Sequence, residues 1–134
     1  MVEADLGSSD TSTRGIRVNV VSKYVMERSR PLMNEYFFSY TIKIVNEGRE
    51  TVQLISREWI ITDAEGHVEE VRGPGVVGEQ PVLGPGDAFE YTSACPLTTP
   101  FGSMSGTYQM VTDKGERFDA EIGTFELAEP YAIN

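Results

Sequence analysis

The chain has 134 residues, with 11 basic and 21 acidic side chains and a formal net charge of −10 at pH 7. This length suits one domain whose core needs no disulfide or metal, and the hydrophobic content of 40% is that of a globular protein. The acidic balance argues against nucleic acid and anionic membrane as partners, because binding to phosphate groups requires a basic surface. It leaves cations and basic protein surfaces open.

The first residues are acidic and rich in hydroxyl groups, where a signal peptide would be basic and then apolar. No run approaches the ~20 apolar residues that cross a bilayer. The single cysteine, Cys95, has no partner for an internal disulfide, as expected in a reducing compartment. We therefore predict a cytoplasmic protein with a flexible tail over residues 1–14 and one domain over residues 15–134.

Apolar residues alternate with polar ones along most of the chain, which predicts strands that present one face to a core. The alternating sets are Ile16, Val18 and Val20; Tyr36, Phe38, Tyr40, Ile42 and Ile44; Phe89, Tyr91, Ser93 and Cys95; Met104, Tyr108 and Met110; and Phe118, Ala120 and Ile122. Within residues 51–63 the alternation changes phase, which indicates a β-bulge near Ser56. Gly123 indicates a second bulge.

Glycine-containing turns separate these strands. The segments NEGRE (46–50), DAEGH (63–67) and TDKGE (112–116) each place a glycine where a hairpin needs a positive φ. No window shows the 3.6-residue apolar period of a helix. About seven short strands at this spacing predict an all-β fold, an antiparallel β-sandwich of the immunoglobulin or fibronectin type III kind, with Trp59 in its core.

One loop has the G-x-G-x-x-G spacing of a phosphate-binding motif, formed by Gly73, Gly75 and Gly78. Such a motif binds phosphate because a helix follows it and directs free N–H groups at the ligand. Pro81 and Pro85 exclude a helix after this motif. We therefore expect a structural crossing between strands, and a phosphate or nucleotide site built from the loop backbone alone remains an alternative.

A second candidate site is a hairpin that carries Asp63, Glu65, His67 and Glu69. Carboxylate oxygens suit hard divalent cations, and a histidine favours transition metals. No second histidine accompanies them, so a solvated acidic turn is favoured over a specific metal site. No cofactor is predicted.

The sequence offers no persuasive catalytic set. In FGSMSGT (101–107) the centre of a nucleophile elbow falls on Met104. The one histidine, His67, belongs to a different hairpin, and Cys95 alternates in phase with core residues. We predict a non-enzymatic binding module.

The predicted interaction surface consists of two long proline-containing segments, residues 73–86 and 95–106. Loops carry much of the function on rigid sandwich scaffolds, and proline-fixed loops lose little entropy when they dock. The side chains predicted to contact a protein partner are Val76, Val77, Leu97, Phe101 and Met104.

Three stretches closely resemble the bacterial ApaG family: SREWIITD, RGPGVVGEQPVLGPGDAFEYTSACPLTTPFGSMSGTYQMV and the ending FELAEPYAIN. The resemblance runs from about residue 16 to residue 134. It implies a fibronectin type III or immunoglobulin-like sandwich. It also implies a protein-interaction module, because related eukaryotic domains occur in an F-box protein and in a DNA polymerase delta-interacting protein.

The resemblance also implies two alternative functions. The family's glycine motif, here Gly73, Gly75 and Gly78, has prompted suggestions of pyrophosphate or nucleotide binding. A genetic link to cobalt resistance and magnesium efflux implies an accessory factor in divalent cation homeostasis, with weak binding of Mg²⁺ or Co²⁺. We predict protein binding first and keep these two as alternatives.

Overall fold

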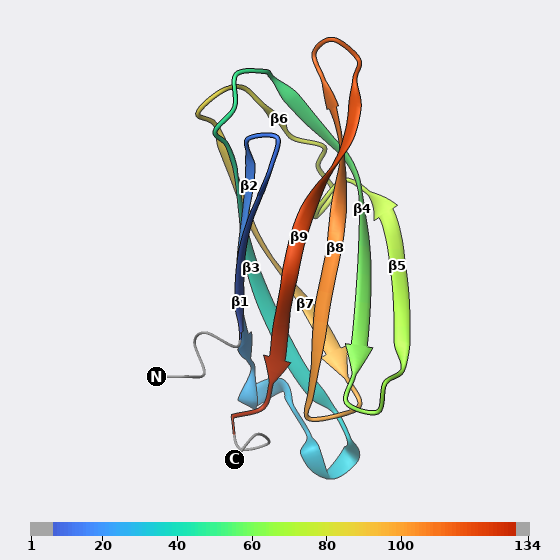
Figure 1. Ribbon diagram of the computed structural model, residues 1–134. Coiled ribbons are helices and arrows are strands. Elements are labelled where there is room, and N and C mark those ends of the chain that lie inside the picture. Colours follow the sequence, from blue (N-terminus) through green and yellow to red (C-terminus); the bar gives the residue numbers. More distant parts are fainter. Residues whose placement is uncertain (1–6, 131–134) are drawn as a thin grey trace.

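The computed structural model describes residues 7–130 and shows two antiparallel sheets packed face to face (Figure 1). The strands are β1 (Ser8–Thr13), β2 (Ile16–Tyr24), β3 (Tyr36–Asn46), β4 (Val52–Asp63), β5 (Val68–Pro74), β6 (Val82–Leu83), β7 (Ala88–Leu97), β8 (Phe101–Thr112) and β9 (Arg117–Ala128). Two single-turn 3-10 helices, η1 (Met26–Arg28) and η2 (Pro31–Met33), join β2 to β3. The predicted sandwich is confirmed, although with nine strands in these residues rather than about seven.

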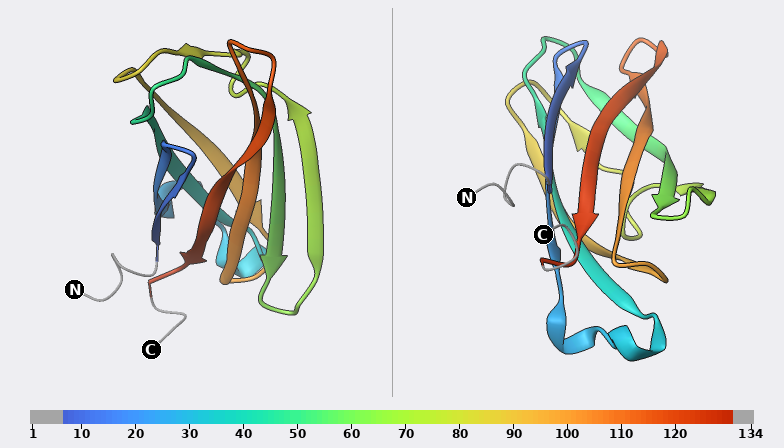
Figure 2. Two further views of the ribbon diagram at one scale, coloured as in Figure 1. Left: turned by 45° about the horizontal axis from the view of Figure 1, so that its top comes forward. Right: turned by 60° about the horizontal axis from the view of Figure 1, so that its bottom comes forward.

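The two sheets have different strand orders, visible from two further directions in Figure 2. One sheet is β1-β2-β3-β7, and the other is β5-β4-β8-β9 with the short β6 also paired to β4. All of these pairs are antiparallel. Within the described residues, no helix has the length and apolar character to cross a membrane.

Trp59 fills the middle of the core, as the alternation predicts. Its ring centroid lies 5.4 Å from that of Tyr40 on the opposite sheet and 6.0 Å from that of Phe125 on β9, with edge-on geometry in both pairs. Aromatic pairs in this arrangement add about 0.5–1.5 kcal/mol to the stabilisation from buried area. The two sheets are therefore joined by one aromatic cluster.

Both predicted bulges are present. The β4–β8 register shifts between Leu54 and Ser56, which leaves Ile55 as the extra residue. On β9, Gly123 and Thr124 together face one residue of β8. A side chain at Gly123 would collide with Thr11 on β1, so this bulge also permits close approach of the first strand.

Two of the three predicted hairpin glycines are confirmed: Gly66 has φ 86° and Gly115 has φ 83°. The prediction for residues 46–50 is wrong, because this segment connects β3 in one sheet to β4 in the other, and Gly48 has no positive φ. The buried Asn46 side chain organises the crossing. Its amide donates to the carbonyls of Glu50 (2.8 Å) and Leu83 (2.9 Å).

The predicted tail, residues 1–14, is wrong for residues 8–13, which form β1; residues 1–6 lie outside the described residues. Its hydroxyl groups reach across to β9. Ser9 Oγ donates to the carbonyl of Gly123 (2.8 Å), and Thr13 Oγ1 accepts from the amide of Glu121 (3.1 Å). The serine- and threonine-rich composition suggested a mobile segment. Instead, this segment forms a strand whose hydroxyl groups bond to β9 and close one side of the sandwich.

Two buried tyrosines meet between the sheets. The hydroxyl oxygens of Tyr91 on β7 and Tyr108 on β8 lie 2.6 Å apart, and Tyr108 is fully buried. Burial raises the pKa of both phenols well above the ordinary value of 10.0. Each hydroxyl therefore depends on the other for a hydrogen-bond partner in an apolar environment.

We expect Tyr91→Phe to lower the free energy of unfolding by about 1–3 kcal/mol, because it leaves the Tyr108 hydroxyl buried without a partner. The Tyr91→Phe/Tyr108→Phe double variant removes both polar groups and should lose less than the sum of the two single losses. Urea denaturation of the three variants measures both effects. Strictly additive losses would contradict the coupling.

Candidate functional site

The glycine motif forms a tight turn. The backbones of Val76 and Glu79 exchange two hydrogen bonds, of 2.8 and 2.9 Å. The central residues Val77 and Gly78 have φ of 42° and 83°, which is the pattern of a type I′ turn. In the described residues the chain continues from this turn to β6 without a helix, as predicted.

Three amides of this loop have partners within the protein. Gly75 N–H donates to the carbonyl of Ile55 (2.8 Å), in addition to the bonds of Val76 and Glu79. Arg57 Nη1 donates to the carbonyls of Pro74 (3.0 Å) and Gly75 (2.9 Å). A side chain at Gly73 would press on this guanidinium, 2.9 Å from Nη1. The glycines thus make room for Arg57 and for the turn, which gives no support to a phosphate site.

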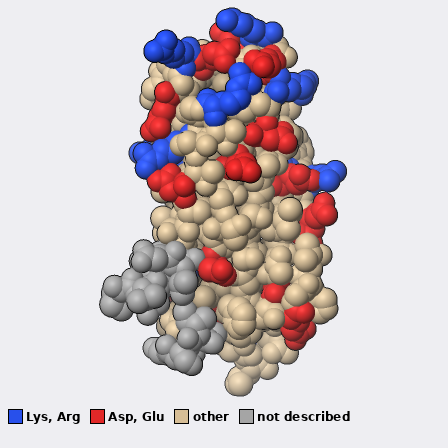
Figure 3. All heavy atoms as spheres, viewed as in Figure 1, with Lys and Arg blue, Asp and Glu red and all other residues tan. Residues whose placement is uncertain are grey.

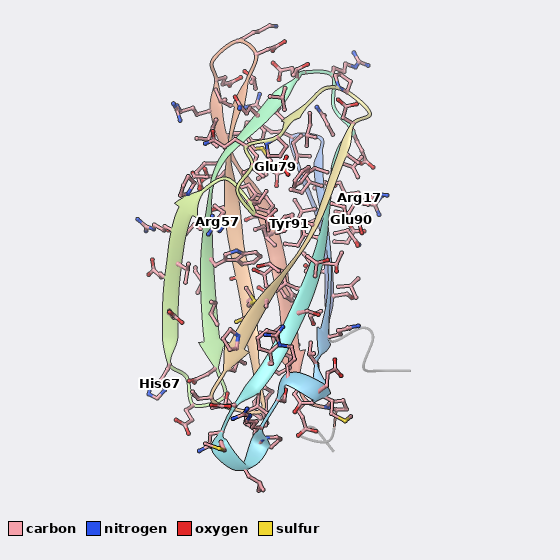
Figure 4. The ribbon with its side chains drawn as sticks, turned by 180° about the vertical axis from the view of Figure 1, so that it is seen from behind. Arg17, Arg57, His67, Glu79, Glu90 and Tyr91 are labelled. Carbon is pink, nitrogen blue, oxygen red and sulfur yellow. The ribbon has the colours of Figure 1, made fainter. Side chains whose placement is uncertain are left out.

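In the acidic hairpin, the Asp63 carboxylate stabilises the turn by accepting hydrogen bonds from its backbone. Its Oδ1 accepts from the amides of Glu65 (2.9 Å) and His67 (3.0 Å), and its Oδ2 lies 3.2 Å from His67 Nδ1. Partial desolvation raises the pKa of Asp63, but these hydrogen bonds outweigh it and the net pKa is lowered. His67 projects outward at the tip (Figure 4), and Glu69 lies on β5 beyond it.

Across residues 7–130, no group of three or more histidine, cysteine, aspartate or glutamate side chains is arranged to hold a metal ion. The structure brings Asp63, Glu65 and His67 together, but the Asp63 carboxylate accepts hydrogen bonds from the turn backbone and is not arranged as a metal ligand.

The two segments predicted to form one interaction surface lie at opposite ends of the sandwich. Gly75 bonds to Ile55 near the start of β4, whereas Gly102 faces Asp63 at its end. With about 3.3 Å per residue, these points are roughly 25 Å apart along the strand.

Three of the five predicted contact side chains, Val76, Leu97 and Met104, are buried in the core. The prediction is wrong for them because Leu97 and Met104 are inward-facing strand residues of β7 and β8, and Val76 anchors its loop to the core. Val77 and Phe101 are exposed, but they belong to the two opposite ends.

Five large exposed apolar residues belong to segments at the lower end of Figure 1, namely the connection with η1 and η2 and the first residues of β5 and β8. They are Met26, Leu32, Met33, Val68 and Phe101, which we call the apolar end. Leu32 and Met33 are 102% and 63% exposed, at the tip of a turn closed by the bridge between Arg30 and Glu35. The tip leads into Tyr36, which pairs with Leu97 just before the turn that precedes Phe101, the first residue of β8.

The ion pairs of Arg14 and Arg17 lie at the opposite end. Arg14 in the β1–β2 turn bonds Glu116 (3.0 Å) and Glu50 (3.4 Å), and Arg17 bonds Asp10 (2.6 Å). Figure 3 shows most of the lysine and arginine side chains of the visible face at this upper end, with few charged groups below. The two ends of the domain thus differ in chemistry.

A cleft of about 330 Å³ lies between the sheets where β5 and β7 are the outer strands. Its apolar walls include Trp59, Ile61 and Val71, and its charged groups are Arg57 and Glu69. Cys95 reaches it from β7. Burial, and to a smaller extent the charge of Glu69, raises the pKa of the Cys95 thiol to about 11.

Sequence reasoning missed both the apolar tip and the cleft. Residues 25–35 show no period, and the only signal was a cluster of apolar residues around Pro31 without alternating partners. Arg57 precedes Trp59 by two residues and so shares its inward face on β4. This spacing of two residues from Trp59 was the signal in the sequence that a charged side chain points between the sheets.

These features define a small antiparallel β-sandwich domain with one closed and one open side. The chain belongs to the ApaG domain family, whose model matches residues 26–112. It is 53% identical to Protein ApaG of Beijerinckia indica, over 91% of this chain and 94% of that one. It is 57% identical to Protein ApaG of Methylobacterium radiotolerans, over 89% and 92% of the two chains.

A solved structure titled as the putative ApaA protein from Bordetella pertussis has the same fold, with a TM-score of 0.85 and 52% sequence identity. The match covers 87% of this chain and 95% of that one.

Val77 is a β-branched residue with φ 42°, a left-handed conformation that costs about 1–2 kcal/mol for such side chains. Because its side chain is largely exposed, we expect Val77→Asn to raise the free energy of unfolding by about 1 kcal/mol. As a control, Gly78→Ala introduces strain at the next position and should lower it. Urea denaturation measures both, and a destabilised Val77→Asn would contradict the strained turn.

The thiol of Cys95 should alkylate with a pH midpoint near 11 in the folded protein and near 9 in urea. Because the folded pKa is the higher one, the stabilisation from the neutral thiol is complete below pH about 9 and is lost as the pH rises toward about 11. We expect Glu69→Gln to lower the folded midpoint. Iodoacetamide rates against pH measure this, and equal midpoints in both states would refute it.

Proposed function

We propose that this ApaG-family domain is a non-enzymatic cytoplasmic module that binds another protein through its apolar end. The observation that carries the proposal is the exposure of Met26, Leu32 and Met33, at 66%, 102% and 63%. Side chains of this kind usually lie inside a protein or at an interface. Several large exposed apolar side chains at one end of a small domain are typical of a protein-binding site.

The position of the apolar end also supports the proposal. Its tip is fixed by the two backbone hydrogen bonds between Arg30 and Glu35 (2.7 and 3.1 Å). Arg28 stacks over the Phe37 ring at 4.5 Å, which fixes the base of the same segment. A surface that is already ordered loses little conformational entropy on binding.

The charged groups of this segment balance one another. Arg28 and Arg30 flank the exposed methionines and leucine together with Glu27 and Glu35, all four exposed. An apolar surface with a mixed polar edge favours a partner with an apolar centre and a polar rim. Phosphate and divalent-cation binding have no comparable support, since the amides of Gly75, Val76 and Glu79 and the Asp63 carboxylate already have partners.

The test is affinity capture from extract of the source cell with a Leu32→Ser/Met33→Ser/Phe101→Ser variant. We expect the variant to lose a protein that the unaltered domain captures. With that protein purified, its dissociation constant should rise about tenfold or more, as for interface anchor residues.

The matched control is Val21→Ser/Val82→Ser, which replaces two exposed valines away from the apolar end. It should keep the partner. Urea denaturation confirms that both variants are folded. Retention of every captured protein by the triple variant would refute the proposed surface.

A further inference from the structure

One side of the sandwich is closed and the other is open. The first is closed by β1, whose Ser9 and Thr13 bond to β9. On the second, β5 has β4 and β7 has β3 as its one strand partner among residues 7–130. In Figure 4, β7 lies close to the β4–β5 pair at the lower ends of the strands and diverges from it above.

The outer edge of β7 has backbone groups that point away from its neighbour β3. Asn46 N–H donates to the carbonyl of Asp87 (2.9 Å), and the Asn46 carbonyl accepts from Gly86 N–H (2.7 Å), so Asp87 lies at a position of β7 bonded to β3. Bonded and outward positions alternate along an antiparallel ladder, so the register assigns the outward N–H and C=O groups to Glu90, Thr92 and Ala94. Pro96 agrees with this assignment, because its missing N–H falls at an outward position.

Glu90 and Pro96 protect the two ends of this edge, but the stretch between them does not carry such residues. Between Tyr91 and Cys95 it has neither a charged residue nor a proline. The facing edge strand β5 differs, with Glu70 and Arg72 on its outer face and Pro74 at its end. Proteins normally protect exposed edges with such residues, so the bare stretch of β7 is available for pairing.

The cleft beneath this edge has a charge at each end and an apolar middle. Arg57 faces Gly73, Trp59 faces Val71, and Ile61 faces Glu69 along the β4–β5 pair. The two charged side chains are therefore four residues apart, roughly 13 Å. Arg57 uses Nη1 for the loop carbonyls, and no hydrogen bond or ion pair of Glu69 with another residue in 7–130 is found.

We infer that the open side binds an extended segment of a partner protein, which adds to β7 as an antiparallel strand. Alternate side chains of that strand point into the cleft. Number the added strand from its first inward residue. Because it runs antiparallel to β7, the side chain at position 1 then contacts Glu69, that at position 3 contacts Trp59 and Val71, and that at position 5 contacts Arg57. The segment has the pattern basic–x–apolar–x–acidic from its amino end.

This contact uses different residues from the apolar end, so the two proposals fail separately. The probe is the acetylated and amidated peptide TKTITET, and its control is the charge-exchanged TETITKT. Fluorescence of Trp59, the one tryptophan in the chain, reports on the cleft. Amide hydrogen exchange at Thr92 and Ala94 reports on strand pairing.

We expect TKTITET to change the tryptophan fluorescence and slow exchange at Thr92 and Ala94. TETITKT should bind about tenfold more weakly, because both charge contacts become repulsive. The same peptide methylated at the backbone nitrogens that face β7 should not bind. A fluorescence change without protection at Thr92 and Ala94 would overturn strand addition.

Neighbouring glutamates on β5 provide the matched variants. Glu69→Lys should weaken TKTITET binding, whereas Glu70→Lys, on the opposite face of the strand, should leave it unchanged. Both substitutions are at exposed positions, and the fluorescence spectrum without peptide confirms folding. No response to about 5 mM peptide, or equal effects of the two variants, would overturn the inference.

Discussion

The packing of Trp59 against Tyr40 and Phe125 is the interaction on which the rest of the structure depends. It fixes β4 to the opposite sheet at its middle, and the inward alternation of β4 follows from that point. Arg57 then faces inward at the margin of the core, where it donates to the carbonyls of Pro74 and Gly75. The course of the glycine loop is therefore linked to the placement of one tryptophan.

The bulge at Ile55 gives β4 a second role. Before the bulge, at Val52 and Gln53, the strand pairs with β6; after the bulge, from Ser56 onward, it pairs with β5. The Ile55 carbonyl accepts from Gly75 N–H (2.8 Å) and from Gln80 Nε2 (2.9 Å), so one extra residue holds both arms of the loop. A G-x-G-x-x-G spacing arises here from turn geometry and close packing, without any ligand.

The sandwich, its tryptophan core and both bulges were predictable because alternation is a local property that burial enforces strongly. The interaction surface was not. Val76, Leu97 and Met104 lie in proline- and glycine-rich parts of the sequence that resemble exposed loops. Whether they are buried depends on which strands lie opposite them, which the local sequence does not show. The sequence of residues 46–50 resembles that of a hairpin turn. In the structure the segment crosses between the sheets, held by the hydrogen bonds of the buried Asn46 amide. The hydroxyl-rich first strand was missed because its partners on β9 are more than a hundred residues away in sequence.

The separation of ion pairs and apolar groups to opposite ends has a consequence for solution behaviour. The pairs of Arg14 and Arg17 are exposed, so added electrolyte screens them. Excluded salts such as sulfate act in the other direction on apolar contacts and strengthen them. A complex held by Leu32 and Met33 would therefore tighten in moderate ammonium sulfate, whereas one held through the guanidinium groups would dissociate.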